Sequence, residues 1–370
     1  MMQFDKILAI LRWFRNQMLF YIHIPFCDSK CYYCAFNSYV DKFHLKDNFI
    51  EALKKQIIFE IQRYKIQKNS IETLYIGGGT PSTICPLKLK EIIDLIKPNF
   101  DKNIQISIEA NPNSASLEWL KGVKSLGVNR ISFGVQSFDD KKLKFLGRNH
   151  TSLIARVGIE NAKKVGFENI SIDLIYGTSL DTKQSLKKEL EEIDKLDINH
   201  ISLYSLTLEE NTKFFEKSEV ANDNLANAQF LISQIQKRGF EWYEISNFGK
   251  NSYSEHNLGY WRYKDYVGAG AGAVGFLKDR RFYRENSIEE YIKNPTFVTE
   301  EILSKDDMKF EKLFLGFRSI VGVNKNILNQ NELKKIKILL DEKKIIEKDN
   351  RYFNKDFLLA DELALFIMNS

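Results

Sequence analysis

The feature that most constrains the fold is an alternation of short β-rich runs with amphipathic segments along residues 19 to 245. This alternation is typical of repeated βα units around a parallel sheet. Between the runs, apolar residues recur at helical spacing, as at Phe49, Leu53, Ile57 and Ile61. The fold class predicted is α/β, a partial (β/α)6 barrel of the TIM type. Its strands are predicted at 19–24, 73–76, 105–109, 130–135, 171–176 and 201–206, with a further strand at 242–245.

Beyond about residue 300 the chain becomes rich in lysine, with helical segments at 308–320 and 332–340 and a hairpin around Asp349 and Asn350. This pattern predicts a smaller C-terminal helical domain of winged-helix type. Met18 stands directly before the first strand, so residues 1–18 are either a leader outside the core or a short packed helix. The expected domains are therefore a leader at 1–18, a barrel at 19–285 and a C-terminal domain at 286–370.

Composition narrows the class of protein. The 54 Lys and Arg residues exceed the 49 Asp and Glu residues by only five, without a run of five or six like charges, so no nucleic-acid partner is expected. The sequence contains no stretch of 18 apolar residues, the length needed to span a bilayer. Peripheral contact with a membrane stays open. The short apolar piece near the N-terminus lacks a cleavage site. A cytoplasmic protein is predicted.

Three cysteines lie together at Cys27, Cys31 and Cys34, and Cys85 is isolated, which is unlike a disulfide framework. Thiolates bind iron-sulfur clusters or zinc. A [4Fe-4S] cluster with three cysteine ligands keeps one iron open, and that iron can chelate S-adenosylmethionine, whose sulfonium is cleaved by one electron to give a deoxyadenosyl radical. The alternatives are a structural zinc that also uses His23, or three packed cysteines; Cys85 is expected to be a packing residue.

Several unusual residues follow the predicted strands. They include the glycine-rich run 77–81, the segments 109–112 and 134–137, and the strand that carries Asp173. Because active sites of barrels lie at the carboxyl ends of their strands, these segments are expected to converge on one mouth. Glycine lets the backbone approach a ligand closely, so the run after the second strand is either a binding loop or a tight turn.

The segment 21–38, with the sequence YIHIPFCDSKCYYCAFNS, resembles the radical S-adenosylmethionine (SAM) proteins. The resemblance is to the group that contains oxygen-independent coproporphyrinogen III oxidase and the HemW-type haem chaperones, and it extends over about residues 19–275. It implies a [4Fe-4S] cluster on the three cysteines and an external electron donor. It further implies SAM contacts from Tyr21, Gly78, Gly79, Thr80, Glu109, Gln136, Arg148 and Asp173.

Two features favour the haem-chaperone branch. Phe36 stands where the oxidase pattern has a further cysteine, and the segment 255–261 matches the His-Asn-x-x-Tyr-Trp motif of the chaperones. His256 would offer an axial nitrogen to haem, and Tyr260 and Trp261 would offer flat apolar faces. The alternative is that His256 bonds within a loop and Trp261 is core. The glycine-rich stretch 267–273 is expected to be flexible or closely packed.

The function predicted is a haem-binding radical SAM protein that delivers haem to acceptors such as respiratory haem proteins. Delivery is implied by the resemblance alone. Two alternatives stay open: an oxidase that decarboxylates the propionates of coproporphyrinogen III, and a radical enzyme with an unrelated substrate. Whether the protein is an enzyme is left undecided by its sequence.

Overall fold

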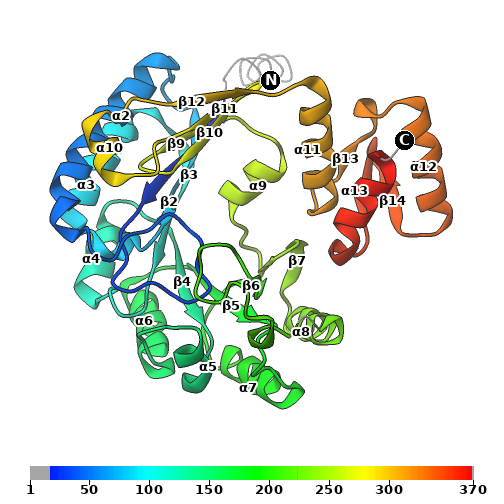
Figure 1. Cartoon of the computed structure of the whole chain (residues 1–370), viewed down its shortest axis with the longest axis horizontal. Coiled ribbons are helices and arrows are strands. Elements are labelled where there is room, and N and C mark those ends of the chain that lie inside the picture. The colour runs from blue at the N-terminus through cyan, green and yellow to red at the C-terminus, as the bar shows by residue number, and fades with distance from the viewer. Residues whose placement is uncertain (1–16, 223, 369–370) are drawn as a thin grey trace, which may run out of the picture.

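A computed structural model describes residues 17–222 and 224–368, so the predicted leader lies outside it except for its last two residues. Six parallel strands lie side by side in chain order (Figure 1). The prediction of an α/β fold with a largely parallel central sheet is confirmed, because each strand pairs in parallel with the next. These strands are β1 (Met18–Ile24), β2 (Ile71–Gly78), β3 (Phe100–Ala110), β4 (Arg130–Gln136), β5 (Asn169–Tyr176) and β6 (His200–Ser205).

Helices cover the outside of this curved sheet (Figure 1). Phe49, Leu53 and Ile57, which recur at helical spacing in the sequence, are fully buried on the inner side of the first of these helices. The helices are α2 (Lys46–Arg63), α3 (Pro86–Ile96), α4 (Leu117–Ser125), α5 (Asp140–Phe145), α6 (Ser152–Val165), α7 (Lys183–Ile193) and α8 (Leu225–Lys237).

The sheet continues beyond β1 and β6 to twelve strands. The predicted strand near 242–245 is an edge strand, β7, in a hairpin with β8, and α9 (Glu255–Trp261) follows it. On the other side, β9 pairs in parallel with β1, and the outermost strand, β12, is exposed along its length. The added strands are β7 (Glu241–Glu244), β8 (Asn247–Gly249), β9 (Tyr266–Ala269), β10 (Val274–Leu277), β11 (Arg280–Tyr283) and β12 (Thr299–Ile302).

The glycine-rich stretch 267–273 is closely packed backbone. A Cβ on Gly268 would lie 2.0 Å from the carbonyl oxygen of Val274, and a Cβ on Gly270 would lie 2.2 Å from that of His23. Gly270 also has a φ of +109°, which side-chain-bearing residues rarely adopt. These glycines therefore let β9 and the following turn press directly against β1 and β10.

The C-terminal unit has its own core, in which Leu313, Phe317, Ile336 and Leu363 are buried. Asp349 and Asn350 both adopt positive φ, as a two-residue hairpin turn requires. In Figure 1 the unit lies to one side of the sheet, beyond α9. Its elements are α11 (Lys305–Phe317), β13 (Val323–Asn324), α12 (Gln330–Asp341), β14 (Ile345–Lys348), β15 (Arg351–Asn354) and α13 (Ala360–Met368).

Backbone hydrogen bonds join this unit to the edge strand β7. The amide of Ile245 donates to Arg318 at 2.8 Å, and the amide of Ile320 donates to Tyr243 at 2.9 Å. The segment just after residue 285 forms α10 (Ile288–Lys293) and β12, which belong with the large sheet. None of the helices in the described part of the chain is both long and apolar enough to cross a membrane.

Candidate functional site

A cavity of about 500 Å³ lies at the carboxyl ends of the parallel strands. The loops after β1, β2 and β3, the end of β4, the segment after α5 and the strand β5 all contribute to its walls. It therefore brings together residues that are far apart in the sequence, as expected for a barrel. The predicted site residues on its walls are Cys27, Cys31, Cys34, Gly78, Gly79, Thr80, Glu109, Gln136, Arg148 and Asp173.

The three cysteines lie on the loop that leaves β1, and none of them is in a disulfide. Tyr39 closes the base of this loop, since its amide donates to Pro25 at 2.8 Å and its carbonyl accepts from Cys27 at 3.0 Å. Burial raises the pKa of the Cys27 and Cys34 thiols. A bound metal counters this effect, because coordination stabilises the thiolate. The loop thus presents three soft donors to one cavity.

The glycine run after β2 packs against the cysteine loop. A Cβ on Gly79 would lie 3.0 Å from Cys27 Sγ and 2.8 Å from the carbonyl oxygen of Phe26. The hydroxyl of Thr80 donates to Cys27 Sγ at 3.4 Å. Only glycine therefore allows the two loops to approach this closely. Three thiol donors and a Cβ-free backbone beside them fit a [4Fe-4S] cluster that keeps one iron open to a ligand.

Arg148 and Asn111 connect the loops around the cysteines. Arg148 Nη1 donates to Cys31 Sγ at 3.2 Å, and its Nη2 donates to Asn111 Oδ1 and to the Gly134 carbonyl, both at 2.7 Å. Asn111 Nδ2 donates in turn to Thr80 Oγ1 at 3.1 Å. Arg148 Nε has no hydrogen-bond partner among the residues described. Arg148 also lines the cavity, so its positive charge can attract a ligand carboxylate.

Two carboxyl groups make the cavity acidic. Glu109 accepts hydrogen bonds from the Tyr75 hydroxyl at 2.7 Å and from the Gly78 amide at 3.1 Å. Desolvation and then the nearby charge of Asp173 raise the pKa of Glu109 to about 7. Desolvation also raises the pKa of Asp173, which accepts from the Ser132 hydroxyl at 3.1 Å. Burial is the main cause of both shifts, so a cationic ligand placed beside these carboxyls would favour their ionised forms.

Gln136 lies at an irregular point in β4. The pairing of β4 with β5 shifts register between Phe133 and Gln136, and Gln136 has a φ of 67°. A left-handed conformation is uncommon for a residue other than glycine, and bulges of this kind re-aim side chains beside functional sites. The irregularity places Gln136 on the cavity wall with Glu109 and Asp173.

Sequence reasoning assigned no role to several other residues of this cavity. Asn111 follows Glu109 directly after β3, and its place at the end of a strand was the available signal. The end of β6 also contributes Tyr204, Ser205, Leu206 and Thr207 to the walls, although no site residue was predicted there. In both cases the position at the end of a parallel strand indicates that the residue lines the cavity, whereas its residue type does not.

Tyr21 does not line the cavity of the cysteines. It lines a neighbouring cavity of about 590 Å³ with His23, Phe36, Tyr260 and Tyr266. The Tyr21 hydroxyl lies 3.0 Å from His23 Nδ1, and His23 Nε2 lies 2.8 Å from the Asn37 carbonyl. Both ring nitrogens of His23 are therefore engaged, and its role as a zinc ligand finds no support. In the described chain, no three His, Cys, Asp or Glu side chains surround a single-ion site.

The His256, Tyr260 and Trp261 side chains lie on α9. His256 is buried, its Nδ1 lies 2.7 Å from the Thr73 hydroxyl, and its Nε2 lies 2.8 Å from the Tyr260 hydroxyl. Burial lowers the pKa of His256 to about 3. An axial bond to haem iron would require one of these hydrogen bonds to break. Trp261 is half-buried, and its Nε1 has no partner in the described chain.

A parallel barrel with three thiols and a glycine loop at one mouth is the arrangement of a radical SAM protein, and the model of the radical SAM superfamily matches residues 21–193. The chain belongs to the HemW family of radical SAM proteins. It is 38% identical to the haem chaperone HemW of Lactococcus lactis over 82% of each chain. It is 36% identical to the haem chaperone HemW of Bacillus subtilis, over 82% of this chain and 84% of that one.

A solved structure shares the whole fold. The coproporphyrinogen III oxidase HemN of Escherichia coli, a radical SAM enzyme, matches 98% of this chain and 93% of its own with a TM-score of 0.80. The two sequences are 20% identical, so this likeness concerns the fold alone. The radical SAM family implies a [4Fe-4S] cluster and SAM as cofactors, and the cavity of the cysteines has the donors that such cofactors need.

Proposed function

We propose that this protein is a haem chaperone: it binds haem, carries a [4Fe-4S] cluster with SAM, and passes haem to acceptor proteins such as respiratory haem proteins. The observation that carries the proposal is the single cavity that gathers three cysteines, a glycine loop and two buried carboxyls. That cavity occurs in a chain whose relatives are named haem chaperones. The cytoplasm is the proposed location.

In this proposal Cys27, Cys31 and Cys34 bind the cluster. Arg148 pairs with the SAM carboxylate, and Glu109 accepts from its amino group or a ribose hydroxyl. Asp173 and Gln136 bind the ribose, while the backbone of Gly78, Gly79 and Thr80 binds the methionine end. A cluster held by these three cysteines and reduced by an electron donor would supply one-electron chemistry to a bound sulfonium. Tyr21 is not a wall of this cavity, so we propose it only as a neighbour of the cofactor.

The haem part of the proposal is supported by the HemW relatives and by the motif that carries His256, Tyr260 and Trp261. In this structure His256 is fully hydrogen-bonded, and Tyr260 is the member of the motif that reaches a cavity. The oxidase alternative is supported only by a shared fold. Its expected reaction, loss of propionate carboxyls from coproporphyrinogen III, serves as a test of the proposal.

The test compares anaerobically reconstituted wild-type protein with a variant in which Cys27, Cys31 and Cys34 are alanine. We expect iron and sulfide in the wild type only, and a change in the electron paramagnetic resonance spectrum of the reduced cluster when SAM is added. Haem titration should show saturable binding by the wild type, followed by transfer to a haem-free b-type protein. Conversion of coproporphyrinogen III to protoporphyrinogen, or haem binding no stronger than to a nonspecific control, would overturn the chaperone proposal.

A further inference from the structure

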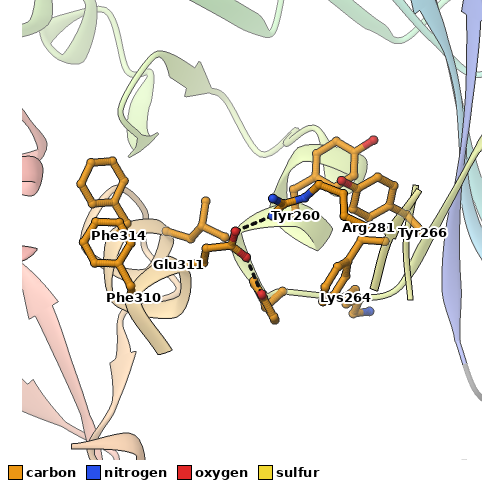
Figure 2. A pocket seen from close by; sticks show the side chains of 10 residues that line it. Tyr260, Lys264, Tyr266, Arg281, Phe310, Glu311 and Phe314 are labelled. Atoms are coloured by element: carbon orange, nitrogen blue, oxygen red, sulfur yellow. Dashed lines mark hydrogen bonds and ion pairs between the residues drawn. The ribbon is translucent and has the colours of Figure 1, made fainter. Parts of the chain in front are cut away.

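A second, aromatic cavity of about 280 Å³ lies between α9, the strands β9–β11 and the helix α11 of the C-terminal unit (Figure 2). Charged groups are present among the rings: Arg281, Lys264 and Glu311. Large aromatic side chains supply flat apolar contact area, and a few placed charges fix the orientation of a ligand. The six rings that line it belong to Tyr260, Tyr263, Tyr266, Phe276, Phe310 and Phe314.

One carboxylate already occupies the polar end of this cavity. Glu311 accepts hydrogen bonds from the guanidinium of Arg281 and from the hydroxyl of Tyr263, one on each of its oxygens (Figure 2). Arg281 also reaches Glu301 at 3.4 Å, and Lys264 pairs with Glu72 outside the ring cluster. The cavity therefore offers two donors, from Arg281 and Tyr263, in a geometry that fits a carboxylate.

The aromatic cavity shares two walls with the cavity beside the cysteine loop. Tyr260 and Tyr266 line both, with their ring centroids 4.6 Å apart. The cavity beside the cysteine loop also reaches Phe36, whose side chain is 69% exposed. These two rings form a wall common to both cavities, so the part of a planar ligand that exceeds 280 Å³ must stay outside the aromatic cavity or displace the rings of Tyr260 and Tyr266.

On the basis of the proposed function, we propose that the aromatic cavity binds the edge of a carboxylate-bearing tetrapyrrole. The macrocycle packs against the rings of Tyr260 and Phe314, and one propionate takes the place of Glu311 on Arg281 and Tyr263. A propionate has the same charge and the same acceptor atoms as the Glu311 side chain, so the exchange preserves both hydrogen bonds. In this arrangement His256 is a positioning residue, because its contact with the cavity passes through the Tyr260 hydroxyl.

The test is a haem titration of the full-length protein with two ligands: haem and its dimethyl ester, which lacks free carboxylates. The variants are Arg281→Gln, Glu311→Gln and Phe314→Ala, and Phe297→Ala, which alters a half-exposed ring outside the cavity, is the control. We expect Arg281→Gln to weaken haem binding about tenfold and to leave ester binding unchanged. Glu311→Gln should strengthen haem binding, because it removes the competing carboxylate. Phe314→Ala should weaken both ligands.

The outcomes separate this inference from the proposed function. If the wild type binds neither ligand above a nonspecific control, the haem function itself fails. If the wild type binds haem but all three cavity variants bind it equally well, the location is wrong. If His256→Ala alone abolishes binding, or alone shifts the Soret band of the haem that stays bound, His256 is the iron ligand and the aromatic cavity is overturned. A loss of haem binding in Glu311→Gln would show that Glu311 supports the fold and does not occupy a ligand position.

Discussion

Asn111 Oδ1 lies 2.7 Å from Arg148 Nη2, and Asn111 Nδ2 donates to Thr80. Asn111 therefore links Arg148 and Thr80, the two side chains that bond to cysteine sulfurs. Asn111→Ala leaves Arg148 without one of its acceptors. We expect the cluster to assemble and SAM affinity to fall by about tenfold, as for the loss of a charge-assisted hydrogen bond. Iron content and SAM titration measure the two effects separately. Asn113→Ala, at an exposed residue that bonds Asn149, is the matched control.

A second prediction concerns Gly79. In Gly79→Ala the new Cβ would press on Cys27 Sγ and on the backbone of Phe26, neither of which can move freely. We expect iron and sulfide per chain to fall below half of the wild-type value, and the free energy of unfolding to fall by about 1–3 kcal/mol. Gly158→Ala is the control, since its Cβ would meet Phe133 at 3.6 Å and Pro112 at 4.0 Å, both ordinary contacts. Equal cluster content in both variants would contradict the close approach of the two loops.

SAM affinity should depend on pH through Glu109. Desolvation and then the charge of Asp173 raise its pKa to about 7, against the lowering effect of Tyr75, the Gly78 amide and Arg130. A cationic ligand favours the ionised carboxylate, so binding should weaken as the pH falls below 7 and Glu109 takes up a proton. We expect about tenfold weaker binding at pH 6 than at pH 8. Calorimetry of Glu109→Gln should show lower affinity at pH 8 and a flat profile, whereas Glu118→Gln, on the exposed side of α4, should behave as the wild type.

Glu244 predicts a pH dependence of stability. It is buried beside the C-terminal unit, and burial raises its pKa to about 7. Between its unfolded value of about 4.5 and 7, the folded protein binds a proton that the unfolded chain does not, so this contribution to the free energy of unfolding falls as the pH rises.

Glu244→Gln stays neutral, and it should therefore exceed the wild type in stability at pH 8 by on the order of 2 kcal/mol and match it near pH 4.5. Urea unfolding at several pH values measures the difference. Glu191→Gln, at an exposed position on α7, should leave the pH profile unchanged. A parallel displacement of the Glu244→Gln curve, without a change in slope, would show that the carboxyl is ionised in the folded protein.

The strands that could be predicted are those whose apolar runs are long enough to show a period. The positions of β1 to β6 could be predicted from such runs, and the loop of the cysteines from the spacing of Cys27, Cys31 and Cys34. The strands β9 to β12 have four residues each, and β9 and β10 also contain a glycine, so the sequence carries no alternation long enough to infer them. They form because β9 can pair with β1, a contact between distant segments.

The surroundings of single side chains were harder to predict. Thr73, the partner of His256, lies 183 residues away along the chain, and no local pattern reports that contact. Tyr21 and His23 are two residues apart on one strand, so both face the same side, and that side belongs to the neighbouring cavity. Most residues named from the family motif reach one cavity, because most of them end or follow a parallel strand. Asp173, inside β5, and Arg148, after α5, reach it as well.

An open sheet of twelve strands has two edges on which a second chain could add a strand. At β12 that edge carries Glu300 and Glu301, both in ion pairs with arginines. At β7, Tyr243 and Ile245 are already hydrogen-bonded to the segment after α11, so this edge is covered and cannot accept another strand. A chain cut before Lys305 would lose this cover, so it should self-associate even though the residues of the large core are all present.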